Sequence, residues 1–293
     1  MQFLQNLIFG ISLGSIYAIM ALGYTMVYGI AKMLNFAHGD VIMVGSYVVF
    51  YAVAASGMNP ILGILLSVVI CTVMGIVIEK VAYKPLRKVA SLAVLITAIG
   101  VSYLLQNVAL LLFGADTKSF PDVLSLPSLN LAGGALTISG TAVLAIVCCL
   151  IIMAGLLTFI KKTKAGQAML AVSEDKDAAQ LMGVNVNKTI SLTFAIGSGL
   201  AAIAGVLLCS QYHSLNPYTG ALPGIKAFTA AVFGGIGSIP GAFVGGLLLG
   251  IIEDLSSAYI STQLANAIVF AVLIVVLLVK PTGLFGKKIR EKV

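Results

Sequence analysis

The chain has 293 residues, of which 60% are hydrophobic and only 9% are charged, and its mean hydropathy is +1.10. A soluble domain carries about 25% charged residues, so this composition excludes a soluble protein. At roughly 20 apolar residues per spanning helix, the hydrophobic content allows about eight or nine spans. The sequence therefore predicts an all-α polytopic membrane protein. In a membrane protein the net charge of +7 is not a sign of nucleic-acid binding, because the positions of the basic residues matter more than their sum.

Long uncharged runs predict membrane helices along the whole chain. They lie at 4–29, 41–57, 60–78, 89–114, 140–160, 190–212 and 262–279. Several runs are apolar all round, as expected for helices that face lipid. An eighth, glycine-rich region lies at 227–252. We therefore expect about eight transmembrane helices in a single membrane domain over residues 1–293.

The eighth region has an unusual pattern of glycine and proline. Gly237, Gly241 and Gly245 follow one another at a spacing that lets helix backbones approach closely. Pro240 interrupts the middle, and each half is too short to span the membrane comfortably. This favours a broken or re-entrant helix buried against its neighbours. The alternative is one continuous helix with a kink.

The basic residues predict the orientation. Of the 17 Lys and Arg residues, only Lys118 and Lys226 fall on one set of connections, and the others fall on the opposite set. The positive-inside rule therefore places 30–40, 79–88, the loop 161–189 and the tail 280–293 in the cytoplasm. The loop 115–139 and the N-terminus are then external. Region 227–252 must enter and leave by the external face if its flanking connections are both external.

The ten acidic residues are assigned to span ends and loops. Asp40 and Glu79 are placed at cytoplasmic ends and Glu253 at an external end, with no acid in the middle of a span. Ion-coupled carriers usually have an intramembrane carboxylate, so this placement disfavours them. We find no catalytic or metal-binding grouping of residues and no phosphate-binding Gly-x-x-x-x-Gly-Lys-Ser/Thr motif. An enzyme is therefore disfavoured, and ATP-driven transport would require a nucleotide-binding partner.

Two polar tracts are candidates for lining a solute path. Gln106 and Asn107 interrupt the run 89–114, and Asn35 and His38 lie between the first two runs. Their side chains can donate and accept hydrogen bonds to a zwitterionic solute. The alternative is structural, since buried amides also form hydrogen bonds between helices and a lone histidine is more often a structural hydrogen-bonding group.

The cytoplasmic loop 161–189 contains a candidate docking helix. Ser173 can cap its N-terminus, Leu181 and Met182 extend an apolar face, and Gly183 suits its end. A helix this short is unstable alone in water and needs a partner surface. It is either a docking element for a cytoplasmic protein or an ordinary surface helix.

Residues 177–183, Asp-Ala-Ala-Gln-Leu-Met-Gly, resemble the Glu-Ala-Ala-x-x-x-Gly loop of ABC importer permeases. The Ile-x-Leu-Pro that usually follows is replaced by Ile-Ser-Leu-Thr at 190–193. Further tracts occur in order along the chain, and with them it resembles, end to end, the LivH-type permeases of branched-chain amino acid ABC importers. These tracts lie at 14–23, 27–29, 35–39, 43–47, 79–87, 105–107, 226–232, 234–242 and 281–284.

The resemblance implies a type II ABC importer-like bundle that works by alternating access in the bacterial inner membrane, surrounded by lipid. It implies a second, homologous permease subunit, two cytoplasmic ATPases and a periplasmic binding protein. ATP and magnesium would be bound by the ATPases, so no cofactor is expected on this chain. The solute would be a branched-chain or related apolar amino acid. The alternatives are urea or a short-chain amide, a homodimer, and, outside the family, a stand-alone ion-coupled carrier.

The resemblance also implies roles for particular residues. Coupling to the ATPase is expected from Asp177, Ala178, Ala179, Leu181, Met182 and Gly183. The translocation path is expected to involve Asn35, His38, Gln106 and Asn107. From their spacing alone, and not from the resemblance, Gly237, Pro240, Gly241 and Gly245 are expected to allow the close packing of the broken helix.

Overall fold

The computed structural model describes residues 2–286 except 88, 90, 125 and 132–135. Seven of its helices are long and apolar enough to cross a membrane. The helices are α1 (Gln2–Ala31), α2 (His38–Phe50), α3 (Pro60–Ile78), α4 (Ser91–Phe113), α5 (Gly140–Lys162), α6 (Lys164–Glu174), α7 (Lys176–Leu181), α8 (Val186–Tyr212), α9 (Ala221–Gly234), α10 (Ile239–Tyr259) and α11 (Ala265–Val279). A π-helical turn, Tyr51–Ala55, extends α2, and two short turns, Glu79–Tyr83 and Lys84–Leu86, follow α3. The prediction of an all-α polytopic protein is confirmed.

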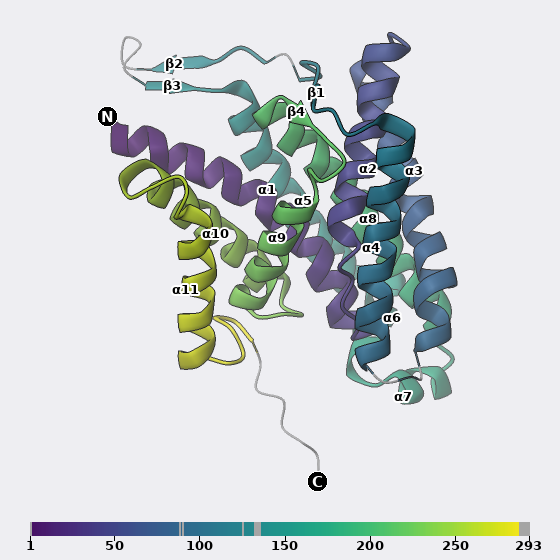
Figure 1. The fold of residues 1–293 in the computed structure, drawn as a ribbon. Helices are drawn as coiled ribbons and strands as arrows, with labels where there is room; N and C mark the ends of the chain where they lie inside the picture. The colour runs from purple at the N-terminus through teal and green to yellow at the C-terminus, as the bar shows by residue number, and fades with distance from the viewer. Residues whose placement is uncertain (1, 88, 90, 125, 132–135, 287–293) are drawn as a thin grey trace.

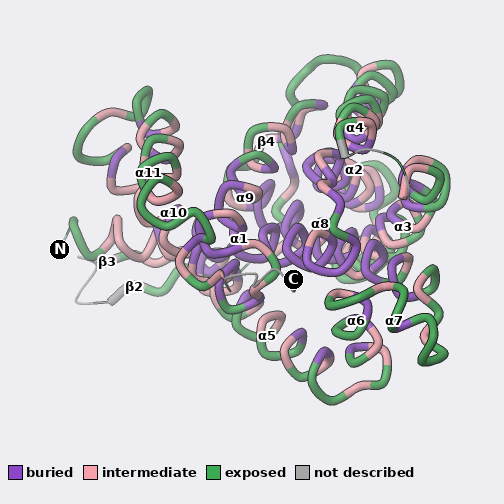
Figure 2. Tube along the Cα trace, turned by 90° about the horizontal axis from the view of Figure 1, so that it is seen from below, coloured by how far each residue is buried: buried purple, intermediate pink, exposed green. Residues whose placement is uncertain are grey.

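Helices α1 and α8 form the centre of the bundle. About four-fifths of the most apolar window of each is buried by protein, whereas α3, α4 and α5 bury less than a third. Figure 2 shows the same arrangement, with buried α1 and α8 surrounded by more exposed helices. The outer helices are apolar all round, and their exposed Leu, Ile and Val side chains suit contact with lipid.

Helix ends are set by local capping. The side chain of Asn59 accepts a hydrogen bond from the Ile61 amide at the start of α3, where Pro60 lacks an amide proton. Asn185 caps α8 and Ser238 caps α10 in the same way. These caps fix where α3, α8 and α10 begin.

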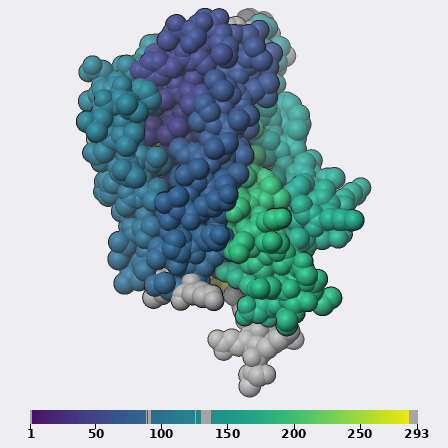
Figure 3. All heavy atoms as spheres, turned by 90° about the vertical axis from the view of Figure 1, so that its right-hand side faces the viewer, coloured from purple at the N-terminus to yellow at the C-terminus, as the bar shows by residue number. Residues whose placement is uncertain are grey.

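The two ends of the bundle differ. At one end lie the N-terminus and two short antiparallel sheets (Figure 1). One sheet pairs β1 (Lys118–Ser119) with β4 (Ser214–Leu215), and the other pairs β2 (Leu129–Leu131) with β3 (Leu136–Ile138), in the register Lys118↔Leu215 and Leu129↔Ile138. The opposite end carries α6 and α7. A side view shows the outer face formed by α3 and α4, beside the projecting green and teal atoms of α6–α8 (Figure 3).

The glycine-rich region consists of two separate helices, α9 and α10, with a break at Gly235–Ser238. The expectation that both halves are too short is wrong for the second. Helix α10 has 21 residues and is long enough to span, whereas α9 has 14. Pro240 lies in the first turn of α10, where its missing amide proton costs nothing.

The break permits very close backbone contacts. A side-chain carbon added at Gly241 or Gly245 would lie 2.4 Å from the Gly234 carbonyl oxygen and 2.2 Å from that of Ala230, so both glycines face α9. Gly237 has a φ of +93° in the turn between the helices, a conformation that glycine adopts at little cost.

The assignment of acidic residues only to span ends and loops is wrong. Asp40 and Glu79 are buried in α2 and in the turn after α3, and Glu253 lies within α10. Lys226 does not lie on an external connection either, since it is buried in α9. Hydropathy windows place charged residues at span ends because an unpaired charge is costly in lipid. Here Glu79 is paired with Arg87, and Glu253 with Lys226, and these pairs offset that cost.

The loop 161–189 contains two helices where one was expected. Thr163 caps α6, and Asp175 caps α7 by accepting hydrogen bonds from the amides of residues 177 and 178. Ser173 therefore does not cap the docking helix, because its hydroxyl donates to the Leu170 carbonyl at the end of α6. Gly183 does end α7 as expected, with a φ of +85°.

Candidate functional site

Helices α2 and α9 both begin inside the bundle, and their first residues touch. The backbone of Gly220 is so close to that of Gly39 that an added side-chain carbon would lie 1.8 Å from the Gly39 carbonyl oxygen. The His38 ring packs against Gly23 of α1, eight residues before α1 ends, which is about 12 Å along the helix axis. The connection between α1 and α2 therefore returns into the bundle before α2 starts.

A cavity of about 260 Å³ lies beside this contact. Its wall comes from four helices and the connection before α2, namely Tyr24, Phe36, Gly39, Asp40, Ile99, Ser102, Tyr103, Gln106, Ala221 and Ile225. The Asp40 side chain accepts a hydrogen bond of 2.8 Å from the Gln106 amide, and Asp40 is only 1% exposed. The cavity thus combines one buried carboxylate with largely apolar walls.

The four residues expected on the translocation path are in different environments. Gln106 lines the cavity, whereas the buried side chain of Asn35 accepts a hydrogen bond of 2.9 Å from the Tyr83 hydroxyl. His38 is buried against Tyr24 with ring centroids 4.5 Å apart, and its Nε2 has no hydrogen-bond partner among the described residues. Asn107 is exposed on α4 and bonds to the carbonyl of Tyr103 in its own helix.

Sequence reasoning missed Tyr24, Ser102 and Asp40 as cavity residues. Tyr24 and Ser102 lie in apolar runs with no local signal that distinguishes them from packing residues. Asp40 is predicted to lie at a span end because the positive-inside rule assigns residues 30–40 to a cytoplasmic connection. The only available signal was the shortness of the next apolar run, which leaves room for a helix that starts inside the bundle.

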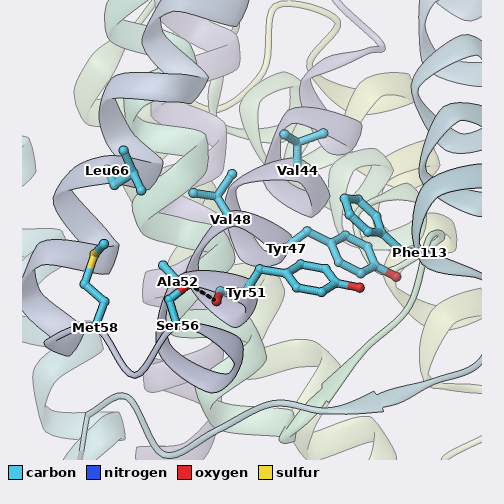
Figure 4. Close-up of a pocket in the computed structure, with 9 residues that line it drawn as sticks. All are labelled: Val44, Tyr47, Val48, Tyr51, Ala52, Ser56, Met58, Leu66 and Phe113. Atoms are coloured by element: carbon cyan, nitrogen blue, oxygen red, sulfur yellow. Dashed lines mark hydrogen bonds between the residues drawn. The ribbon is translucent and has the colours of Figure 1, made fainter.

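A second cavity, of about 380 Å³, lies farther along α2 and is almost wholly apolar. Its aromatic wall contains Tyr47, Tyr51 and Phe113, whose rings lie side by side in Figure 4. The Tyr47 and Phe113 rings stack with centroids 4.3 Å apart. The residues that line this second cavity include no charged side chain.

A buried ionic cluster joins α1, α9 and α10. The Lys226 ammonium lies 2.7 Å from a Glu253 carboxylate oxygen, and the Tyr17 hydroxyl donates to the other oxygen at 3.0 Å. The Lys226 and Glu253 side chains are 6% and 13% exposed. The Glu79 carboxylate is similarly paired with Arg87 and also accepts a hydrogen bond from Ser191 of α8.

The end of α7 and its cap expose two large apolar side chains. Leu181 and Met182 are 89% and 85% exposed, whereas Ala179 is buried beneath them. Lys176, at the start of α7, donates a 2.9 Å hydrogen bond to the carbonyl of Ala31 at the end of α1. Burial lowers the pKa of Lys176, and the nearby positive charges of Arg87 and Lys32 lower it further. Helix α7 is therefore tied directly to the central helix.

In the described part of the chain, no group of three His, Cys, Asp or Glu side chains lies close enough together to bind a metal ion.

The family of the chain is decided by its full-length similarity to known proteins. Residues 6–277 match the family model described as the branched-chain amino acid transport system permease component. The chain belongs to this permease family. The high-affinity branched-chain amino acid transport system permease protein LivH of Escherichia coli K12 is 47% identical to it, and the match covers 100% of this chain and 98% of the relative.

Further relatives of the permease support the assignment. The corresponding permease protein BraD of Pseudomonas aeruginosa is 45% identical over 100% of this chain and 98% of the relative. Among solved structures, PsaBC from Streptococcus pneumoniae in complex with Fab matches with a TM-score of 0.51 and 14% identity, covering 97% of this chain and 94% of that chain. At this identity, the match supports the fold alone.

Proposed function

We propose that this chain is the permease subunit of an ATP-driven importer of branched-chain amino acids and that residues 1–293 act as one membrane domain. The observation that carries the proposal is the end-to-end similarity to proteins named as permeases of such systems, at 45–47% identity. The chain would work by alternating access beside a second, homologous permease subunit. A periplasmic binding protein would deliver the amino acid.

The exposed apolar surface of α7 is the proposed contact with the ATPase. Leu181 and Met182 project from a six-residue helix that is too short to be stable without packing partners. Asp177, Ala178, Ala179 and Gly183 would shape this helix and its ends. ATP and magnesium would bind to two ATPase subunits, so no cofactor is assigned to this chain.

The end of the bundle that carries α6 and α7 is proposed to face the cytoplasm of a bacterium, and the end with the N-terminus to face the periplasm. The basic residues Lys161, Lys162 and Lys164 lie at the α7 end, as the positive-inside rule requires. The C-terminal tail, whose residues 287–293 lie outside the described residues, would then be cytoplasmic.

The test is uptake by the assembled system. The chain would be co-expressed with a homologous permease, an ATPase and a binding protein of a branched-chain amino acid system in a strain without leucine uptake. We expect ATP-dependent uptake of radiolabelled leucine. Uptake of urea but not leucine would contradict the substrate assignment, and leucine uptake by this chain alone in ATP-depleted vesicles would contradict the importer assignment.

A double variant in and next to α7 tests the proposed contact with the ATPase separately. Leu181→Asp with Met182→Asp replaces the apolar surface of α7 by charge without disturbing buried residues. We expect loss of the ATPase from the purified complex and at least a tenfold loss of uptake. The control is Leu129→Asp, a 50% exposed leucine at the opposite end of the bundle, which should retain the ATPase. Normal ATPase recovery with the double variant would refute the role of α7.

A further inference from the structure

Asp40 and Glu79 are buried in the described bundle and the Glu253 side chain is 13% exposed, and these three carboxylates differ in how their charge is balanced. Glu79 is paired with Arg87, and Glu253 is paired with Lys226. No Lys, Arg or His among the described residues lies within ion-pair distance of Asp40, whose carboxylate accepts a hydrogen bond from the neutral Gln106 side chain on α4. A buried carboxylate without a cation is costly, which is why such groups inside membranes are by default functional candidates.

The position of Asp40 gives access to a solute. It faces the 260 Å³ cavity, slightly smaller than the roughly 300–1,000 Å³ of drug-sized sites and therefore suited to a small molecule. Phe36, Ile99 and Ile225 provide apolar walls around the single charge. An ammonium group next to an aliphatic side chain matches this distribution of charge and apolar surface.

The same cavity offers a place for a carboxylate. Ala221 and Ile225 line it from the first turns of α9. The Ala221 amide donates to the Tyr218 carbonyl, and Pro223 has no amide proton. Among the described residues, the Leu222 amide is therefore the one left in this turn for a negative group. The first amides of a helix and its dipole favour a negative group. Asp40 and the start of α9 thus lie at one cavity with opposite electrostatic preferences.

We propose that this cavity is an intramembrane binding site for an aliphatic α-amino acid. Asp40, held by Gln106, pairs with the ammonium of the amino acid, and Phe36, Ile99 and Ile225 contact its side chain. The Leu222 amide and the dipole at the start of α9 stabilise its carboxylate. The site rests on the proposed function, because it is a station on the route of the imported amino acid.

A protection experiment tests the site without relying on transport. Ile225→Cys in the full complex places a thiol in the cavity wall, and its labelling rate with a maleimide is measured against the unsubstituted complex, which contains the four native cysteines. We expect 10 mM leucine to slow labelling at least threefold. The same concentration of 4-methylpentanoate, which has the leucine skeleton without the ammonium, should have no effect.

Two further variants make the result specific. Asp40→Asn combined with Ile225→Cys should lose the protection by leucine, since the amide cannot pair with an ammonium. Ser56→Cys, in the wall of the apolar second cavity, is the control and should be labelled at the same rate with and without leucine. If Asp40→Asn does not assemble, the comparison of leucine with 4-methylpentanoate at Ile225→Cys alone decides the question.

Failure of the site and failure of the proposed function give different results. Leucine uptake by the unsubstituted complex without leucine protection at Ile225→Cys would overturn the site and leave the importer intact. Equal protection by leucine and 4-methylpentanoate would overturn the role of Asp40. No leucine uptake by the unsubstituted complex would overturn the proposed function.

Discussion

Breaking the Lys226–Glu253 pair should be more harmful than removing both charges. The two side chains are 6% and 13% exposed, so each remaining partner would be a poorly solvated charge. Removing one partner of a buried pair costs about 3–5 kcal/mol, whereas apolar replacement of the whole pair is often close to neutral. We therefore expect Lys226→Met and Glu253→Met each to lower stability by about 3–5 kcal/mol.

The Tyr17 hydroxyl sets the expected result for the double variant. It donates to Glu253 at 3.0 Å, so Lys226→Met with Glu253→Met leaves a buried hydroxyl unpaired, at a cost of about 1–3 kcal/mol. Adding Tyr17→Phe should recover most of that cost. The double variant should therefore be more stable than either single variant. The free energy of unfolding lost in the double variant should be smaller, by more than about 3 kcal/mol, than the sum of the two single losses.

The assay is thermal unfolding of the detergent-solubilised permease, followed by fluorescence-detected gel filtration. At about 2 °C per kcal/mol for a chain of this size, the single variants should unfold roughly 6–10 °C lower. The double variant should unfold within about 6 °C of the unsubstituted protein. Destabilisation of the double variant by the sum of the two single effects would refute the reasoning, because it would mean that the two charges act independently.

Two more predictions follow from the packing around α1. Gly250→Val should destabilise the bundle by more than about 3 kcal/mol, because its first side-chain carbon would lie 2.1 Å from the Gly14 nitrogen. Gly155→Ala in α5 is the control, since nothing lies within 4 Å, and it should be neutral or stabilising by up to about 1 kcal/mol in the same thermal assay. Lys176→Met removes the donor to the Ala31 carbonyl, so leucine uptake should fall several-fold while the ATPase still co-purifies. Unchanged uptake would show that this contact does not transmit movement from α7.

Hydropathy predicted most of the helices but not where the chain turns inside the bundle. Apolar runs such as 60–78 and 140–160 coincide closely with α3 and α5, because burial in lipid depends on each run alone. The interior starts of α2 and α9 depend instead on contacts between Gly39 and Gly220, which lie far apart in the sequence. A local pattern carries no information about such a contact.

The placement of charged residues was predicted wrongly for the same reason, because it depends on contacts between distant parts of the sequence. Lys226 and Glu253 are on different helices and 27 residues apart, so neither shows in the sequence as the other's partner. Each therefore resembled a residue at a span end. Leu181, Met182 and Gly183, in contrast, form one contiguous motif whose exposed surface and turn are local properties, and the sequence indicated both.

Helix α1 connects the proposed coupling surface to the proposed amino-acid site. Its last residue accepts the hydrogen bond from Lys176 of α7, and Tyr24, two turns earlier, lines the cavity. Tyr17, about two turns further, bonds to Glu253, and the glycines before it pack directly on α10. Because a packed helix moves largely as a unit, a shift of α7 applied at Ala31 would change the cavity wall and the α10 contact together. The Lys176→Met variant therefore tests whether α1 transmits movement between the two proposed sites, as well as the contribution of one hydrogen bond.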